Sequence, residues 1–253
     1  MELKEILEHH IVDHIWSWIH LGPLKLPLSR HLLMMGIASL ILLVVFPLII
    51  RSRSKALSPF RAMIEIIVLF IRDEIVIPNL GHRGAGYLGY FSTLFFFILV
   101  MNLLGLVPYG ATATGNLAVT AGLAITTFCL INFAGIREQG LLSYVGHIVP
   151  KGVPVWLYPL LFPIEIIGLV TKTFALCIRL FANMIGGHIV ILSFISFIFI
   201  FGSFGVGIGL GVAPISVGLV LFTMMLELFV AFLQAYVFVF LTAIFTGAAM
   251  HPH

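Results

Sequence analysis

The feature that most constrains the fold of this chain is a nearly uninterrupted apolar stretch from Tyr158 to Phe201. As a single helix it would be about 66 Å long, roughly twice the thickness of a hydrocarbon core. The alternative is two ordinary spans joined by a loop at Gly186 and Gly187. No charged cluster flanks those glycines to hold a loop in water, and an unpaired backbone turn is costly in lipid. We therefore expect one long, strongly tilted or bent helix.

A second long apolar stretch runs from Pro214 to Gly247. As a helix it would reach about 51 Å. The glycine-rich segment from Gly202 to Val212 is expected to form the turn between the two helices. Residues 155–247 are therefore predicted to form a long tilted helical hairpin.

Composition excludes a soluble globular fold. Hydrophobic residues make up 61% of the chain and charged residues 9%, with a mean hydropathy of +1.18, whereas soluble domains carry about 25% charged residues. The formal net charge of +3 is too small to indicate nucleic-acid binding, and Lys and Arg are spread along the connections. The chain is expected to lie in a lipid bilayer and to bind no nucleic acid.

Shorter apolar stretches precede the long hairpin. Residues 32–50 form the first predicted span, and residues 87–135 hold the second and third. The connection between the second and third spans, at residues 108–116, has no Lys or Arg and is expected to be external. The prediction is an all-α polytopic membrane protein with about five crossing helices in a single membrane domain, residues 1–253.

The connection at residues 51–86 is rich in positive charge. Its basic residues are Arg51, Arg53, Lys55, Arg61, Arg72 and Arg83. The positive-inside rule makes this connection cytoplasmic, which places the N-terminus outside and the C-terminus in the cytoplasm. Arg61, Glu65 and Arg72 share a helical face between Pro59 and Pro78, which indicates an amphipathic helix at the membrane interface and not a crossing.

The N-terminal segment, residues 1–31, is predicted to lie along the membrane interface. Leu3, Leu7, Ile11 and Ile15 recur every four residues, which is typical of a helix with one apolar face. Two histidines, His10 and His14, lie one turn apart but lack a third ligand. The sequence predicts no metal site and no cofactor.

Arg179 is the only permanently charged residue between Lys172 and Glu227. Because arginine cannot lose its proton, it places a fixed positive charge at membrane depth. An arginine that snorkels from a helix end is the alternative, but apolar sequence continues on both sides of Arg179. The charge therefore indicates a function.

Each long helix carries polar residues at spacings of seven and four, which share one face. The first stripe consists of Glu165, Lys172, Arg179 and Asn183, and the second of Ser216, Thr223, Glu227 and Gln234. In lipid, such stripes must face each other, other protein or water, because an isolated polar group costs several kcal/mol.

Interhelical hydrogen bonding, worth about 0.6 kcal/mol per bond, explains the hydroxyl groups of the second stripe. It does not explain Glu165, His188 and Glu227, since neutral Ser or Asn would serve as well. Glu and His exchange protons near neutral pH when burial or a neighbouring charge tunes them. These three residues predict a hydrated proton path.

Three segments carry a family resemblance. In chain order they read MNLLGLVPY from Met101, LCIRLFANMIGGHIVI from Leu176 and LELFVAFLQAYVFVFLTAIF from Leu226. Together they resemble the a subunit, also called subunit 6, of rotary F-type proton-translocating ATP synthases. The match covers nearly the whole chain, and RLFANMIGGH is highly specific.

The resemblance implies a transport subunit that is not an enzyme by itself. In that family an arginine faces a ring of c subunits and separates two aqueous half-channels, and protons ride on the carboxylates of the ring. By position, Arg179 corresponds to that arginine and Gln234 to its hydrogen-bond neighbour. The remaining residues that the resemblance places along the proton path are Glu165, Asn183, His188 and Glu227. The family's acid and histidine swap between two positions, and His188 with Glu227 is similar to the mitochondrial arrangement.

The resemblance also implies partners and a location. The partners are the c-subunit ring, the b-subunit peripheral stalk and the rest of the complex, in the plasma (inner) membrane of a bacterium. Many relatives carry an aspartate in the external loop where this chain has Gly115 before Asn116, so its outer entrance is expected to rely less on fixed negative charge. Proton coupling is favoured over sodium because His188 is a poor sodium ligand.

Two rival functions were weighed against the sequence. A proton-coupled secondary antiporter would predict inverted repeats and paired broken helices, and neither is found in the sequence. An intramembrane hydrolase would require an HExxH motif or a nucleophile beside a base, and Cys177 has no histidine one turn away. The transport subunit remains the leading hypothesis.

Overall fold

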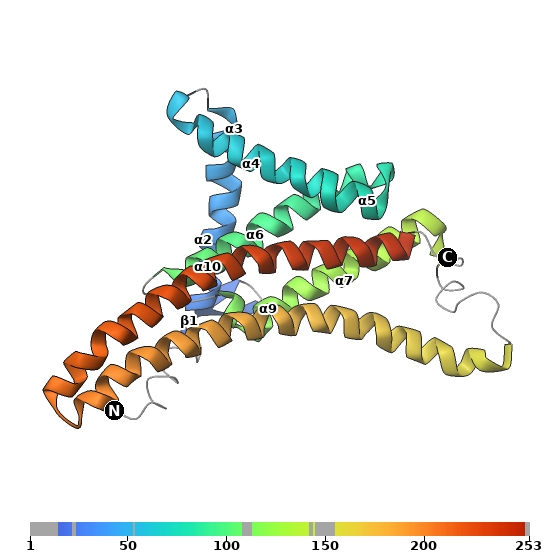
Figure 1. Ribbon diagram of the computed structural model, residues 1–253. Helices are drawn as coiled ribbons and strands as arrows, with labels where there is room; N and C mark the ends of the chain where they lie inside the picture. The colour runs from blue at the N-terminus through green and yellow to red at the C-terminus, as the bar shows by residue number, and fades with distance from the viewer. Residues whose placement is uncertain are drawn as a thin grey trace. The chain divides into compact units, whose positions relative to one another are not determined.

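The computed structural model describes residues 15–21, 24–52, 54–107, 113–141, 144 and 155–250. Helices that are long and apolar enough to cross a membrane number five within these residues (Figure 1). They are Arg30–Arg51, Gly84–Leu106, Leu117–Gln139, Pro159–Gly202 and Val206–Met250. The predicted all-α polytopic class is confirmed.

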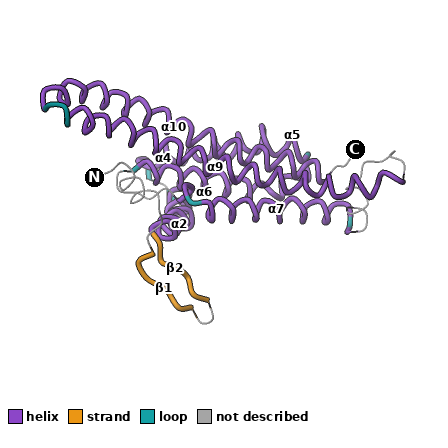
Figure 2. Tube along the Cα trace, turned by 90° about the horizontal axis from the view of Figure 1, so that it is seen from below, coloured by secondary structure: helices purple, strands orange, loops and turns teal. Residues whose placement is uncertain are grey.

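A β-hairpin precedes the first helix, and Figure 2 shows it leading into α2. Strand β1 (Ile15–Leu21) pairs antiparallel with β2 (Leu24–Ser29). The predicted N-terminal helix is therefore wrong for residues 15–20, while residues 1–14 lie outside the described part of the chain. The reason is local. The tryptophans and isoleucines of β1 favour strands, and a Gly-Pro pair separates the sequence of β1 from that of β2.

The first span and the following connection are helical with two π-helical segments. Their elements are α2 (Arg30–Leu40), η1 (Ile41–Val45), α3 (Phe46–Arg51), η2 (Lys55–Leu57), α4 (Ser58–Phe70), η3 (Ile71–Val76) and α5 (Ile77–Leu80). Segments η1 and η3 are π-helical, and each comes just before a proline, Pro47 or Pro78. A proline cannot donate to the carbonyl one turn back, and the wider π turn accommodates this loss.

The predicted amphipathic helix is present and continues past Pro78 to Leu80. Ile64, Ile71 and Ile75, spaced by seven and four, are buried on one face. Arg61 and Glu65 are exposed on another. Such a two-faced helix suits a membrane interface. Its position at the interface remains a prediction.

The remaining elements lead to the long hairpin. They are η4 (His82–Tyr87), α6 (Leu88–Leu106), η5 (Ala113–Gly115), α7 (Leu117–Gln139), η6 (Val155–Leu157), α9 (Tyr158–Gly202) and α10 (Val206–Met250). Helices α9 and α10 contain 45 residues each, and α9 continues through Gly186 and Gly187. The prediction of one long helix, against two spans with a loop at these glycines, agrees with the structure.

The turn between α9 and α10 is shorter than expected. The predicted turn at residues 202–212 is wrong beyond Gly205, because α10 begins at Val206 and includes Pro214. A Cβ on Gly209 would lie 2.7 Å from the Cα of Gly202, so the two helices meet where neither residue has a side chain. The glycines here permit close helix contact and do not prolong the turn.

The chain divides into two compact units. The first unit comprises the described residues within Met1–Ile41, Phe97–Val119 and Leu180–Gln234, and the second those within Leu42–Phe96, Thr120–Arg179 and Ala235–His253. Both long helices contribute to both units. The core of the second unit contains Ile71, Ile75, Phe91, Phe95 and Phe238, all buried, and that of the first contains Ile98, Met101, Leu180, Met184 and Ala231.

The contact between Gly209 and Gly202 predicts that Gly209→Ala destabilises the hairpin. Overpacking of this kind costs about 1–3 kcal/mol. Gly207→Ala is the matched control, because a Cβ at Gly207 meets nothing within 4 Å. Thermal unfolding of the purified protein in detergent should show a lower midpoint for Gly209→Ala only. Equal midpoints for the two variants would contradict the close contact.

Candidate functional site

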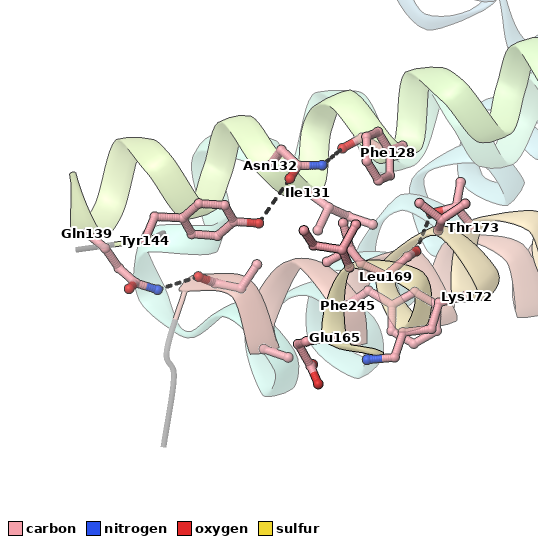
Figure 3. Close-up of a pocket in the computed structure, with 14 residues that line it drawn as sticks. Phe128, Ile131, Asn132, Gln139, Tyr144, Glu165, Leu169, Lys172, Thr173 and Phe245 are labelled. Carbon is pink, nitrogen blue, oxygen red and sulfur yellow. Dashed lines mark hydrogen bonds between the residues drawn. The ribbon is translucent and has the colours of Figure 1, made fainter. Parts of the chain in front are cut away.

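A cavity of about 270 Å³ in the second unit is lined by α7, α9, α10 and Tyr144. Figure 3 shows two charged side chains of α9, Glu165 and Lys172, at this cavity. The Nζ atom of Lys172 lies 5.7 Å from the ring centroid of Phe245 on α10. The sequence predicted Glu165 as a site residue, and the structure places it on the wall of a cavity.

Polar contacts at the end of α7 shape the same cavity. The Tyr144 hydroxyl donates to Asn132 Oδ1 at 3.0 Å, and the amide of Gln139 donates to the carbonyl of Ala249 on α10 at 2.6 Å. The ring of Tyr144 lies against Gly135, where a Cβ would collide with it. Burial raises the pKa of Tyr144 above the ordinary tyrosine value, so its hydroxyl remains a hydrogen-bond donor in alkaline solution as well as at neutral pH. The local sequence of this connection carried no signal for these pairs.

Arg179 lies on an exposed face of α9. Ala175, Ala182 and Gly186 lie on the same face and are also exposed, with spacings of seven and four. In the part of the chain that the structure describes, no ion pair or hydrogen bond is recorded for Arg179. The fixed charge is therefore presented outward between small residues, where a second helix can approach closely.

The polar stripe predicted on α10 is largely buried. Ser216, Glu227 and Gln234 have exposed fractions of 2%, 5% and 5%. Thr223 is partly exposed, and its hydroxyl donates to the carbonyl of Leu219 in its own helix. The stripe thus faces the protein, which is one of the surroundings that the sequence left open.

His188 on α9 and Glu227 on α10 are two predicted site residues that the structure brings within hydrogen-bond distance of each other. His188 Nδ1 lies 3.2 Å from Glu227 Oε1, and both residues belong to the first unit. Gly187 makes room for this pair, because a Cβ there would lie 2.6 Å from the Cδ of Glu227 and closer still to its Oε1. Glu227 Oε2 is buried and has no hydrogen-bond partner among the described residues.

Asn183 is half-buried on α9, and Gln234 is buried on α10. Within the described chain, the structure records no hydrogen bond between either of them and another predicted site residue.

Sequence reasoning missed Gly187, whose role depends on Glu227 far along the chain. The glycine pair in the sequence was a signal, but it pointed to a possible loop.

Metal binding has no support from the described side chains. They include no group of three or more His, Cys, Asp or Glu that could hold an ion. His10 and His14 lie outside the described residues.

Comparison with known proteins identifies the family. The family model for the ATP synthase A chain matches residues 32–247, which include the five candidate spans almost completely and every candidate site residue. The chain belongs to the ATP synthase A chain family.

Relatives within this family are similar over most of their length. The ATP synthase subunit a of Myxococcus xanthus is 46% identical over 92% of this chain and 77% of its own. That of Chloroherpeton thalassium is 41% identical over 96% of this chain and 75% of its own. ATP synthase subunit a 2 of Prosthecochloris aestuarii is 44% identical over 97% of this chain and 79% of its own. The family resemblance read from the three motifs is confirmed.

The space that Gly187 leaves for Glu227 predicts that Gly187→Ala displaces the carboxylate from His188. Gly122→Ala on α7 is the control, because a Cβ there meets nothing within 4 Å. Gly187→Ala should lower the stability of the purified protein by about 1–3 kcal/mol, as expected of overpacking. Gly122→Ala should leave it unchanged. If both variants unfold at the wild-type temperature, the packing of Gly187 against Glu227 is not tight.

Proposed function

We propose that this chain is the proton-translocating stator subunit of the membrane sector of a rotary ATP synthase. The observation that carries the proposal is the contact between partly exposed His188 and buried Glu227. Both groups exchange protons, and neither is needed to hold two apolar helices together. The chain itself catalyses no reaction in this account. It passes protons to and from carboxylates on a ring of c subunits.

Chain order along α9 supports two half-channels on either side of Arg179. Glu165 precedes Arg179 by about 21 Å of helix and His188 follows it by about 13 Å. The cavity with Glu165 lies near Tyr144 and the end of α7. This part of the chain carries Arg137 and Lys151, so the positive-inside rule makes it cytoplasmic. We assign Glu165 to the inner half-channel and the pair of His188 and Glu227 to the outer one, with Asn183 along the path.

Arg179 acts as the barrier and the attractor between the half-channels. A fixed cation repels a proton that would cross directly, and it attracts each deprotonated carboxylate that the ring brings past. The exposed small residues beside it, Ala175, Ala182 and Gly186, permit the close approach of a ring helix. Gln234, which follows Glu227 by two turns on α10, is assigned as the neighbour of Arg179.

The assembly and its location follow from the same proposal. The partners are the c-subunit ring, the b-subunit peripheral stalk and the rest of the complex. The coupling ion is the proton, because His188 is a poor ligand for sodium. The membrane is the bacterial plasma (inner) membrane, with the N-terminus external and the C-terminus cytoplasmic.

The antiporter alternative finds no support in the long hairpin. Antiporter folds place their ion sites at paired interrupted helices. Here α9 and α10 are both continuous over 45 residues. Co-purification decides between the two functions: a stator subunit should purify with a ring of small hairpin proteins, whereas an antiporter should purify as a monomer or dimer.

Arg179→Ala should reduce ATP-driven proton pumping in reconstituted vesicles to background while the complex still assembles, because the fixed cation is lost. Arg179→Lys should also largely fail, because an ammonium lacks the broad guanidinium fork and can lose its proton when desolvated. Arg61→Ala, which removes an exposed arginine of α4, is the matched control and should pump normally. Near-wild-type pumping by Arg179→Ala complexes would refute the proposed role.

The proposed orientation predicts which connections are reached from outside the cell. In a background without native cysteines, Leu117→Cys should react with a membrane-impermeant maleimide in intact cells. Ser54→Cys should react only after the membrane is opened. Both residues are exposed in the structure, so access through the membrane decides the result. Labelling of Ser54→Cys in intact cells would show that the orientation is the reverse of the one proposed.

A further inference from the structure

Asn102 is a fully buried polar side chain to which the proposed proton path assigns no role. It lies on α6 in MNLLGLVPY and is 0% exposed. Its Nδ2 donates to the backbone carbonyl of Ala231 on α10 at 3.2 Å, and its Oδ1 accepts from the Thr114 hydroxyl at 2.8 Å. One side chain therefore joins α6, η5 and α10, all within the first unit.

The backbone carbonyl of Ala231 determines which way the Asn102 amide points. The carbonyl of Ala231 can only accept, so the amide must turn its NH₂ group toward α10. Its oxygen then faces Thr114, whose hydroxyl can donate to it. The opposite orientation would bring two acceptor oxygens together and leave the NH₂ group without the helix carbonyl. Thr114 is also 0% exposed, so the hydroxyl is held inside the protein.

The bond to Ala231 reaches α10 in the middle of its polar stripe. Ala231 lies one turn after Glu227 and three residues before Gln234, so it shares a helical side with both. Ala231 is 1% exposed. A hydrogen bond from a neighbouring helix at this point opposes both sliding and rotation of α10.

We propose that Asn102, held in place by the hydrogen bond from Thr114, is a positioning residue that sets the height and rotation of α10 so that Glu227 meets His188. Apolar packing alone resists sliding of a helix weakly, because one apolar contact replaces another at little cost. The directed bond from Asn102 has a single partner at a single height. This inference rests on the proposed function, since it assigns Asn102 to the same proton path.

Thr114→Val tests the proposal without touching Asn102, Glu227 or His188, because valine has the shape of threonine but no hydroxyl. One interhelical hydrogen bond in a membrane corresponds to about a threefold change, so ATP-driven pumping should fall about threefold. Thr114→Ser keeps the hydroxyl and should restore the wild-type rate. Thr126→Val is the control, because the exposed Thr126 hydroxyl donates only within α7, to Leu123 at 2.8 Å.

A double-mutant cycle separates positioning from a general loss of packing. In a Glu227→Gln background the residual pumping no longer depends on the carboxylate, so Thr114→Val should have little further effect. A second measurement does not depend on pumping. It is the rate of backbone hydrogen exchange in the α10 segment around Ala231, measured in the purified complex. Exchange should be faster in Thr114→Val than in wild type, Thr114→Ser or Thr126→Val.

Wild-type pumping and exchange in Thr114→Val would overturn the proposal, as would the same threefold loss in the Glu227→Gln background. A wild-type complex that assembles with its ring but moves no protons would instead overturn the proposed function. In that case the exchange measurement would still decide whether Asn102 and Thr114 hold α10.

Discussion

A carboxylate buried between apolar helices is tolerated only when another group meets it, and this constraint governs the first unit of the protein. Glu227 is 5% exposed and lies 3.2 Å from His188. The contact requires α9 to remain helical through Gly187 and requires that residue to have no side chain. It also requires α10 to present Glu227 at one height. Burial of a carboxylate without a partner would cost several kcal/mol. The continuous helix at Gly187 and the placement of α10 therefore serve the pair of His188 and Glu227.

The two long helices divide the chemistry between them. The stripe on α10 is buried, whereas Arg179 on α9 is exposed among small residues. A buried group can act only on neighbours within the protein, whereas an exposed fixed charge is available to a partner. In the proposed function, the protein therefore holds the relay groups itself and offers only the arginine to the ring.

The sequence predicted those parts of the structure that depend on length and periodicity. Apolar length predicted the long helices, and spacing predicted that Ser216, Glu227 and Gln234 share one face, which is buried in the structure. Prediction failed where contacts between elements decide. Gly209 reads as a turn residue until Gly202 is seen against it. The strand at residues 15–21 was missed because the four-residue period that ends at Ile15 was extended into the segment after it. The contacts of Asn102 and Gly187 could not be predicted from local sequence, because their partners on α10, Ala231 and Glu227, are distant along the chain.

Passive proton flow tests the central claim, that His188 and Glu227 relay protons, most directly. Vesicles that contain only the membrane sector are given an imposed potential, where 100 mV supplies about 2.3 kcal/mol per charge. Proton flux is then measured across a range of pH for wild type, His188→Ala and Glu227→Ala. The account predicts that each variant conducts more slowly and with a shifted pH optimum, because water replaces the missing group only partly. Wild-type flux with an unchanged pH profile in both variants would show that the pair is structural and would contradict the account.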